Sequence, residues 1–281
     1  MLNKPELYRH ANSLQRLATQ ILLNGYSTKL NWRDDGQDSW LDVGCGSGDT
    51  TIDYILPILP KNFQRLVGAD VSKKMIEYNR ATHVYPKISF ELINLGIDLT
   101  QQPLWQEETF DHISSFFCFM YIRDQQMAVN DLYKLLKPGG DILVAFPSSA
   151  TVFAVYKKQA TEKKWGDIYS DLETVVPCPC QDLLDPAKYF EDITKKSGFK
   201  DISVRVEDIK YTFNGYKALK NFLKSVNPFV DRLPAEKQEE YLDDLIIDYV
   251  NGKFTKDDFR EDKKKLRHTE HYKFLVAYAR K

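Results

Sequence analysis

The sequence predicts an α/β fold in which a parallel sheet carries helices on both faces. Between residues 39 and 146, short apolar runs alternate with helical patterns, as is typical of parallel strands joined by crossover helices. A glycine-rich turn, LDVGCGSGDTT at 41–51, follows the first apolar run. The chain has 281 residues, 43% of them hydrophobic, which is enough for one large domain with a substantial core.

The first half of the chain contains the alternating elements. Apolar runs bounded by glycine, acidic or turn residues predict strands at 39–44, 65–70, 88–94, 110–119 and 141–146. Apolar residues at helical spacing predict helices at 6–24, 50–59, 73–83 and 124–136. Ser72 is a favourable N-cap for the third of these helices, and the KPGG sequence at 137–140 stops the fourth.

The regular alternation stops after residue 147. Helices are predicted near 151–164 and 186–197, and two strands are predicted at 201–213 and 271–280. The residues between these strands, 214–268, have a mostly helical pattern and are too many for an ordinary loop. We therefore expect a single domain over 1–281. Within it, 36–147 form the sheet-based core, and 148–200 and 214–268 form a mostly helical cap over the ligand edge of the sheet.

The charge balance argues against a nucleic-acid partner. The 39 basic side chains nearly balance the 40 acidic ones, so the net charge of −1 produces no field that attracts a polyanion. Two short basic runs, at 163–164 and 263–265, follow acidic residues and are interpreted as solvated helix faces.

The sequence carries no sign of secretion, membrane insertion or metal binding. The N-terminus lacks an apolar signal segment, and no apolar run approaches the roughly 20 residues that span a bilayer. The four cysteines resemble neither a disulfide framework nor a zinc site: Cys45, Cys118, Cys178 and Cys180. We expect a cytoplasmic protein, monomeric or homodimeric, with no metal.

The glycine-rich turn is the first place to look for a ligand, because open parallel sheets bind ligands beyond the carboxyl ends of their strands. A dinucleotide fingerprint, G-x-G-x-x-G, has glycine where this chain has Asp49, and a P-loop would continue with Gly-Lys-Ser/Thr. S-adenosylmethionine has no phosphates and carries a sulfonium and an α-ammonium. A purely structural turn with incidental acids is the remaining alternative.

Acidic residues around the turn favour S-adenosylmethionine. Asp42 precedes the glycines and can face the α-ammonium, while the glycines let the backbone approach the methionine and ribose parts. Asp70 ends the second predicted strand and can hold the ribose hydroxyls. Met75 follows where an apolar side chain could cover the adenine.

With these features the sequence resembles the class I S-adenosylmethionine-dependent methyltransferases. LDVGCGSGDTT is similar to their first motif, GADVSKKMI to the ribose segment and LLKPGGDILVAF to the fifth-strand segment, over roughly 40–147. Nearly end to end, the chain also resembles the insect juvenile hormone acid O-methyltransferases, through LYRHANSLQR, FDHISSFFCFMYIRDQ, VNPFVDRLPAE and LVAYARK.

This resemblance implies a Rossmann-like, mostly parallel seven-stranded sheet whose last strand is antiparallel. It implies S-adenosylmethionine as cofactor, S-adenosylhomocysteine as product, and methylation of a farnesoid carboxylic acid. The implied cofactor residues lie in or shortly after the first four predicted strands: Asp42, Gly44, Cys45, Gly46, Gly48, Asp70, Val71, Met75, Asn94, Leu95, Ser115 and Phe116. The implied substrate residues are Gln15, Phe119, Met120, Tyr121, Ile122, Trp165 and Phe229.

The chain departs from the family at several of these positions. Asn94 replaces an acid near the adenine amino group, although an amide oxygen can still accept from that amine. Met120 and Tyr121 replace a histidine and a tryptophan, and 17–19 read LAT where the family has HDA. Gln15, which in the family helps to hold the substrate carboxylate, is kept.

The chemistry of methyl transfer favours a carboxylate acceptor. A carboxylate is ionised at neutral pH, so it needs no general base, only neutral donors that align it. Gln15 and Tyr121 are such donors and are the expected catalytic residues, beside an apolar wall in which Phe117 is the best candidate for plain core. A phenol acceptor would need a base or a metal, and His10 is the one histidine expected near Gln15.

The leading hypothesis is therefore a methyltransferase acting on the carboxylate of an apolar farnesoid or fatty acid, such as juvenile hormone acid or farnesoic acid. One alternative keeps the fold and cofactor but has a different small-molecule acceptor. Another is a non-catalytic relative that carries a terpenoid or the cofactor, and a dehydrogenase is a further alternative.

Overall fold

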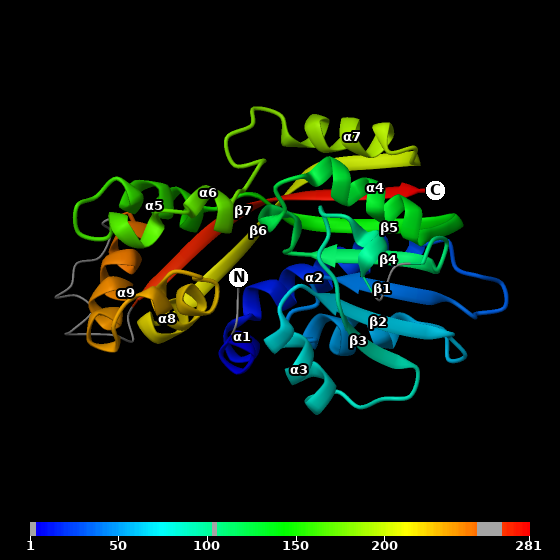
Figure 1. Cartoon of the computed structure of the whole chain (residues 1–281), viewed down its shortest axis with the longest axis horizontal. Coiled ribbons are helices and arrows are strands. Elements are labelled where there is room, and N and C mark those ends of the chain that lie inside the picture. Colours follow the sequence, from blue (N-terminus) through cyan, green and yellow to red (C-terminus); the bar gives the residue numbers. More distant parts are fainter. Residues whose placement is uncertain (1–3, 103–105, 252–265) are drawn as a thin grey trace.

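The fold is built around a seven-stranded sheet in the order β3-β2-β1-β4-β5-β7-β6 (Figure 1). The computed structural model describes residues 4–102, 106–251 and 266–281. Strands β1 to β5 pair in parallel, and β7 runs antiparallel to both β5 and β6. The predicted α/β fold with an antiparallel last strand is confirmed. The strands are β1 (Ser39–Val43), β2 (Arg65–Asp70), β3 (Ile88–Leu92), β4 (Phe110–Phe116), β5 (Leu136–Ser149), β6 (Lys200–Asn214) and β7 (Arg267–Arg280).

Helices flank this sheet and also gather beside it. The described α-helices are α1 (Pro5–Ala11), α2 (Ser13–Tyr26), α3 (Lys73–Thr82), α4 (Gln125–Leu135), α5 (Thr151–Ala160), α6 (Leu172–Val175), α7 (Pro186–Lys196), α8 (Tyr216–Ser225) and α9 (Ala235–Tyr249). Helix α3 packs on β2 and β3, whereas α7 packs on α4, β6 and β7. Figure 1 shows α5, α6, α8 and α9 grouped at one end of the sheet, where β6 and β7 extend into the group.

The N-terminal helix predicted over 6–24 is two helices. The chain breaks at Asn12, between α1 and α2, where the Asn12 side chain donates from Nδ2 to Asp49 Oδ2 at 2.8 Å. The helix predicted over 50–59 is also irregular. Residues Thr51–Ile55 form a π-helical turn and Leu56–Ile58 a 3₁₀ turn, because Pro57 has no N–H to donate to a regular α-helix.

Several strand boundaries differ from the prediction, among them the end of β4, the start of β5 and the start of β7, which is Arg267 and not residue 271. The strand predicted over 110–119 ends at Phe116, because Phe117 has a positive φ of 56° and turns the chain out of the sheet. The KPGG sequence does end α4, but it lies within β5, which begins at Leu136 and is longer than the predicted 141–146.

The second half follows the predicted order with shorter helices. Helix α5 ends at Ala160, not near 164. The stretch predicted as mostly helical over 214–268 contains α8 and α9, and its last two residues belong to β7. Residues 252–265, which include the basic run at 263–265, lie outside the described residues. In the other basic run, Lys164 forms ion pairs with Glu240 and Asp244 of α9.

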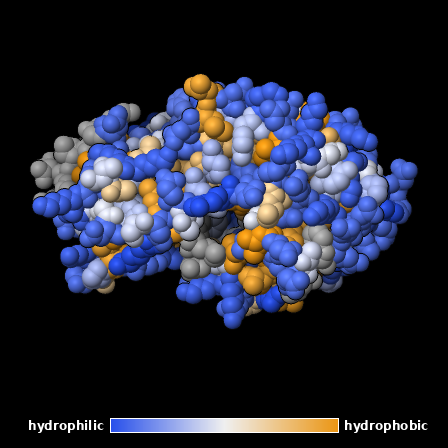
Figure 2. Space-filling view, turned by 45° about the horizontal axis from the view of Figure 1, so that its top comes forward, coloured by the Kyte–Doolittle hydropathy of each residue, from blue (hydrophilic) through white to orange (hydrophobic). Residues whose placement is uncertain are grey.

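The face of the molecule that Figure 2 shows is mostly hydrophilic. Figure 2 shows hydrophobic residues in small, separate groups on one face. Within 4–102, 106–251 and 266–281, no helix has both the length and the apolar character needed to cross a bilayer.

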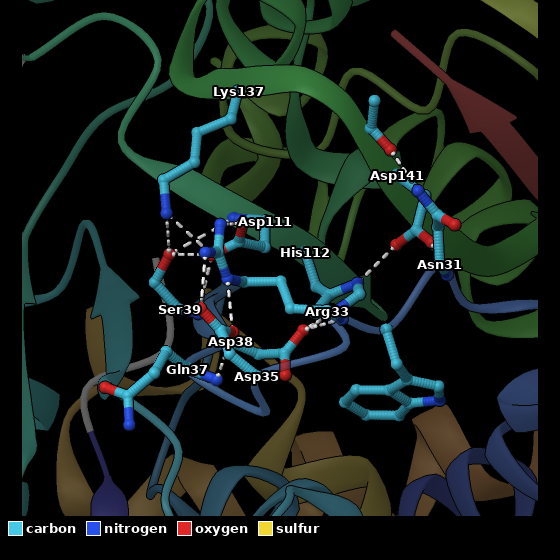
Figure 3. Close-up of polar contacts among 12 residues, drawn as sticks. Asn31, Arg33, Asp35, Gln37, Asp38, Ser39, Asp111, His112, Lys137 and Asp141 are labelled. Carbon is cyan, nitrogen blue, oxygen red and sulfur yellow. Dashed lines mark hydrogen bonds and ion pairs between the residues drawn. The ribbon is translucent and has the colours of Figure 1, made fainter.

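A buried charged cluster holds the amino ends of β1, β4 and β5 together (Figure 3). The imidazole of His112 contacts Asp38 through Nε2 at 3.0 Å and Asp141 through Nδ1 at 2.7 Å, and its side chain is fully buried. Burial by itself lowers the pKa of His112, but the hydrogen bonds to Asp141 and Asp38 outweigh burial and raise this pKa to about 9. The cluster lies at the edge opposite the glycine-rich turn, so its contribution is to stability.

The stability of the protein is expected to fall between pH 6.5 and pH 9. The pKa of His112 is raised from 6.5 to about 9 in the folded protein, so protonation of His112 stabilises the folded state. This stabilisation is fully present below pH 6.5 and is lost as the pH rises through 9. At full effect the loss is about 3 kcal/mol in the free energy of unfolding. Urea unfolding of the wild type and of His112→Gln at both pH values measures it. An equal pH dependence in the two proteins would contradict this assignment, and Asp141→Asn provides a second variant.

Candidate functional site

Three adjoining cavities lie at the carboxyl ends of β1, β2 and β4. The largest, here the strand-end cavity, encloses about 380 Å³ and is lined by Val43, Gly44, Asp70, Val71, Ile93, Asn94, Leu95, Gly96, Ile97, Cys118, Tyr121, Ile122, Arg123 and Asp124. The helix cavity encloses about 20 Å³ and is lined by Tyr8, Asn12, Gln15, Gly44, Cys45, Ser47, Asp49, Thr50, Phe116 and Phe117.

The third cavity, the apolar groove, lies between the sheet, α2 and the helices beside the sheet. It encloses about 40 Å³ and is lined by Leu14, Gln15, Phe117, Met120, Tyr121, Pro147, Ala150, Val152, Phe153, Phe222, Val226, Tyr249 and Tyr272. Shared lining residues connect the three spaces. Gly44 borders the strand-end and helix cavities, Tyr121 borders the strand-end cavity and the groove, and Gln15 borders the helix cavity and the groove.

The glycine-rich turn is folded tightly against β2 and β4. The backbone N–H groups of Gly44 and Cys45 both donate to the carbonyl oxygen of Ala69, at 2.7 and 3.0 Å. Gly44 has a φ of 78°, and a Cβ there would lie 2.5 Å from Cβ of Cys118. The turn therefore brings bare backbone to the point where the strand-end and helix cavities meet.

Asp70 lies at the end of β2, on the wall of the strand-end cavity. Its Oδ2 accepts from the Gly46 N–H at 3.0 Å and its Oδ1 accepts from the Ser72 N–H at 2.8 Å. Burial raises the pKa of Asp70, while these backbone donors oppose the rise. A carboxylate held in this way keeps lone pairs free for ligand hydroxyl groups.

Several predicted cofactor residues share this cavity wall and others do not. Val71, Asn94 and Leu95 line the strand-end cavity, where Asn94 is exposed and its backbone pairs with the Gln102 side chain. Cys45 and Phe116 line the helix cavity. Gly46 approaches Tyr8 of α1, whereas Gly48 is backed by Asn79 and His83.

Asp42, Met75 and Ser115 line none of the three cavities. Asp42 is buried, and its two oxygens accept from Thr51 Oγ1 at 2.7 Å and Ser114 Oγ at 2.9 Å. Burial raises the pKa of Asp42 to about 6, and the two hydroxyl donors oppose this. Ser115 Oγ donates to the carbonyl oxygen of Val43, so Asp42 and Ser115 fasten the turn and the sheet rather than face a ligand.

The two predicted catalytic residues converge on the groove. Gln15, on α2, and Tyr121, in the 3₁₀ turn Phe119–Tyr121 after β4, both line it, as does Met120. Burial raises the pKa of the Tyr121 phenol well above its usual value of 10, so this hydroxyl stays a neutral donor at physiological pH. His10 is exposed on α1 and lines none of the three cavities.

Four predicted substrate residues lie away from the groove. Phe119 is fully buried between Phe146 and Phe190, and Ile122 faces the strand-end cavity. Trp165 donates from Nε1 to Asp244 at 3.1 Å and packs on Tyr241. Phe229 packs between Tyr156 and Tyr169. Trp165 and Phe229 therefore form the interior of the helical group.

Phe117, expected in the core, lines the groove. Its positive φ breaks the alternation of β4, so its side chain lies in the groove with its ring at 5.0 Å from that of Phe274, edge to face. The sequence reasoning also missed Tyr8, Asn12 and Asp49 of the helix cavity. In the sequence, Asp49 stands out only as the residue at the third glycine position of a dinucleotide fingerprint.

Among the residues that the structure describes, no side chain that lines the groove could act as a base at neutral pH. This described lining has no Asp, Glu, His, Lys or Arg, and its ionisable groups are the phenols of Tyr121, Tyr249 and Tyr272. In the part of the chain that the structure describes, no group of three or more His, Cys, Asp or Glu side chains could hold a metal ion.

Comparison with known proteins gives consistent matches. A family model described as a methyltransferase domain matches residues 41–142. The juvenile hormone acid O-methyltransferase of Drosophila melanogaster is 34% identical over all of this chain and 93% of its own length. That of Bombyx mori is 32% identical over 87% of this chain and 85% of its own.

Solved structures show the same fold at low identity. The YcgJ protein of Bacillus subtilis superposes with a TM-score of 0.57 at 14% identity, over 93% of this chain and 98% of its own. Phosphoethanolamine N-methyltransferase 2 of Haemonchus contortus, solved with phosphomonomethylethanolamine and S-adenosylhomocysteine, has a TM-score of 0.52 at 17% identity, over 99% of this chain and 57% of its own.

Proposed function

Because the chain belongs to the class I S-adenosylmethionine-dependent methyltransferases, we propose that it methylates the carboxylate of an apolar small-molecule acid. A farnesoid or fatty acid, such as juvenile hormone acid or farnesoic acid, is the acceptor class. The observation that carries this proposal is the groove, which is apolar and free of bases yet reaches Gln15 and Tyr121. The names of its full-length insect relatives support the same acceptor.

The strand-end cavity fits the adenosine part of the cofactor. Its volume of about 380 Å³ is in the usual range for a small-molecule site. Asp70 would hold the ribose hydroxyls, and Asn94 with Leu95 would border the adenine. When bound, S-adenosylmethionine supplies a methyl group that is already activated by the sulfonium. The protein then has only to align the acceptor oxygen and exclude water.

Gln15 and Tyr121 would orient the acceptor. A carboxylic acid is ionised at neutral pH, so no residue has to remove a proton from it. The amide N–H of Gln15 and the hydroxyl of Tyr121 can each donate one hydrogen bond to the carboxylate without forming an ion pair that would weaken its nucleophilicity. Tyr121 borders both the groove and the strand-end cavity, which supports a role for it where the acceptor would meet the methyl donor.

The groove encloses about 40 Å³, which is less than a farnesoid chain occupies. Binding such an acid therefore requires the helices that border the groove to separate from the sheet. The side chains that would move, Phe222, Val226 and Tyr249, belong to α8 and α9 or directly follow α8.

A different small-molecule acceptor is the second candidate. Met120 and Tyr121, which replace the family's usual histidine and tryptophan, both line the groove, so the acceptor site itself differs from that of the family. Tyr121→Trp combined with Met120→His tests this. If this double variant turns over farnesoid acids at an unchanged rate, Met120 and Tyr121 do not determine which acceptor the protein uses.

The proposal is tested by incubating the protein with S-adenosylmethionine and a panel of farnesoid acids, fatty acids, phenols and amines. Methyl esters of farnesoid or fatty acids are the expected products. Turnover of a phenol or an amine without any ester would overturn the acceptor. Calorimetric binding of S-adenosylmethionine without turnover of any compound would instead favour a non-catalytic carrier.

A further inference from the structure

Three residues that line the helix cavity each have a buried acceptor oxygen without a hydrogen-bond donor. These oxygens are Oδ1 of Asn12, Oε1 of Gln15 and Oδ1 of Asp49. The exposed fractions of these residues are 4%, 6% and 3%. A buried acceptor without a donor is energetically unfavourable, so three such oxygens on residues that line one small cavity indicate a ligand that donates hydrogen bonds.

The surrounding contacts fix these oxygens in place. Asp49 Oδ2 accepts from Asn12 Nδ2 and from Ser47 Oγ, both at 2.8 Å, which leaves Oδ1 as the oxygen without a donor. Oδ1 also lies 3.3 Å from Nε of Arg9, an ion pair on the outer side of α1 where Arg9 is exposed. The break between α1 and α2 is what brings Asn12 and Gln15 to the cavity from neighbouring turns.

The donor that fits is a small cation with several N–H groups. The cavity encloses about 20 Å³, enough for one group of the size of a water molecule. An ammonium has that size and offers three donors, and the carboxylate of Asp49 supplies the opposite charge. Gly44 borders both this cavity and the strand-end cavity, so a ligand that starts at Asp70 can pass over Gly44 and end here.

We infer that the helix cavity binds the α-ammonium at the amino-acid end of S-adenosylmethionine, with Asp49, Asn12 and Gln15 as its acceptors. Asp42, which the sequence suggested for this role, is buried and lines none of the three cavities, and its oxygens accept from Thr51 and Ser114 inside the protein. The inference depends on the cofactor of the family and not on the identity of the methyl acceptor.

Titration calorimetry with two ligands tests this assignment. S-adenosylhomocysteine has the amino-acid end, and 5′-methylthioadenosine has the same adenosine and thioether sulfur without it. Asp49→Asn is expected to lower the affinity for S-adenosylhomocysteine about tenfold or more. The affinity for 5′-methylthioadenosine should stay within twofold of the wild-type value. The matched control is Asp53→Asn, which removes a partly exposed carboxylate paired with Arg16 and should leave both affinities unchanged.

The direction of the change separates the competing explanations. If the cavity held the carboxylate of the amino-acid end, Asp49→Asn would raise the affinity for S-adenosylhomocysteine, because it removes a like charge. If the cavity held only water, the variant would change the affinities for both ligands equally or change neither. A stronger S-adenosylhomocysteine affinity, an equal change or no change would each overturn the inference. If a thermal melt shows that Asp49→Asn does not fold, Asn12→Ala is the second variant, since it keeps the charge of Asp49. Asn12→Ala should lower the affinity for S-adenosylhomocysteine by about threefold to tenfold and leave the affinity for 5′-methylthioadenosine unchanged. Acid methylation is not measured, so the result stands apart from the proposed acceptor.

Discussion

Replacing Gln15 with glutamate is expected to lower kcat/KM for the acid substrate by about 100-fold or more. Gln15 lines both the helix cavity and the groove, and a glutamate there keeps an acceptor oxygen but replaces the amide donor with a second oxygen. When ionised, it also repels the carboxylate of the substrate. The affinity for S-adenosylhomocysteine should not fall, because the glutamate retains an acceptor for the ammonium.

Gln15→Met provides the matched comparison, since methionine is similar in length but has neither the donor nor the acceptor. The expected order of acid turnover is wild type, then Gln15→Met, then Gln15→Glu. For S-adenosylhomocysteine affinity, Gln15→Met should be the weakest of the three. Steady-state kinetics and calorimetry measure these orders. Equal turnover by the two variants would mean that Gln15 acts only through packing.

The second large effect is expected for Gly44→Ala. This substitution should lower the affinity for S-adenosylhomocysteine by about 100-fold or more. It should also lower the free energy of unfolding by about 3 kcal/mol. The φ of 78° is unfavourable for alanine, and the added Cβ would lie 2.5 Å from Cβ and 2.7 Å from Sγ of Cys118. The turn or the start of the segment after β4 must therefore shift, and either shift moves a wall of the strand-end cavity.

Two further variants separate the cost of the positive φ from the cost of the clash with Cys118. Gly139 has a φ of 81°, but a Cβ there would meet only Asn31 Nδ2, at 3.8 Å. Gly139→Ala should therefore cost only the conformational part, about 1 kcal/mol, with binding unchanged. Gly44→Ala combined with Cys118→Gly removes the clashing atoms and should recover part of the stability. If the double variant is no more stable than Gly44→Ala, the clash with Cys118 is not the cause.

The sheet was predictable because its signals are local. Each parallel strand is a short apolar run that ends at a glycine or an acid, and the glycine-rich turn has one plausible position relative to them. Asp70 follows from the same logic, because the last residue of β2 must lie at the ligand edge beside the turn after β1.

The groove was less predictable because it depends on single backbone angles and on contacts distant in sequence. One positive φ, at Phe117, exchanges the expected places of Phe117 and Phe119. Trp165 and Phe229 are large aromatics in the segments predicted to form a cap, and nothing in their spacing distinguishes a pocket wall from the interior of the helical group. The helix cavity requires Asn12 to meet Asp49, 37 positions later in the chain, which no periodicity records.

The position of β7 has a consequence for how the chain is made. This strand lies between β5 and β6, so neither of those can reach its final neighbour until residues 267–280 have been synthesised. A chain that has completed β1 to β6 therefore leaves backbone N–H and C=O groups unpaired along one edge of β5 and one edge of β6. Such unpaired edges favour association with other chains. Pairing of β7 with both strands is the step that covers these edges.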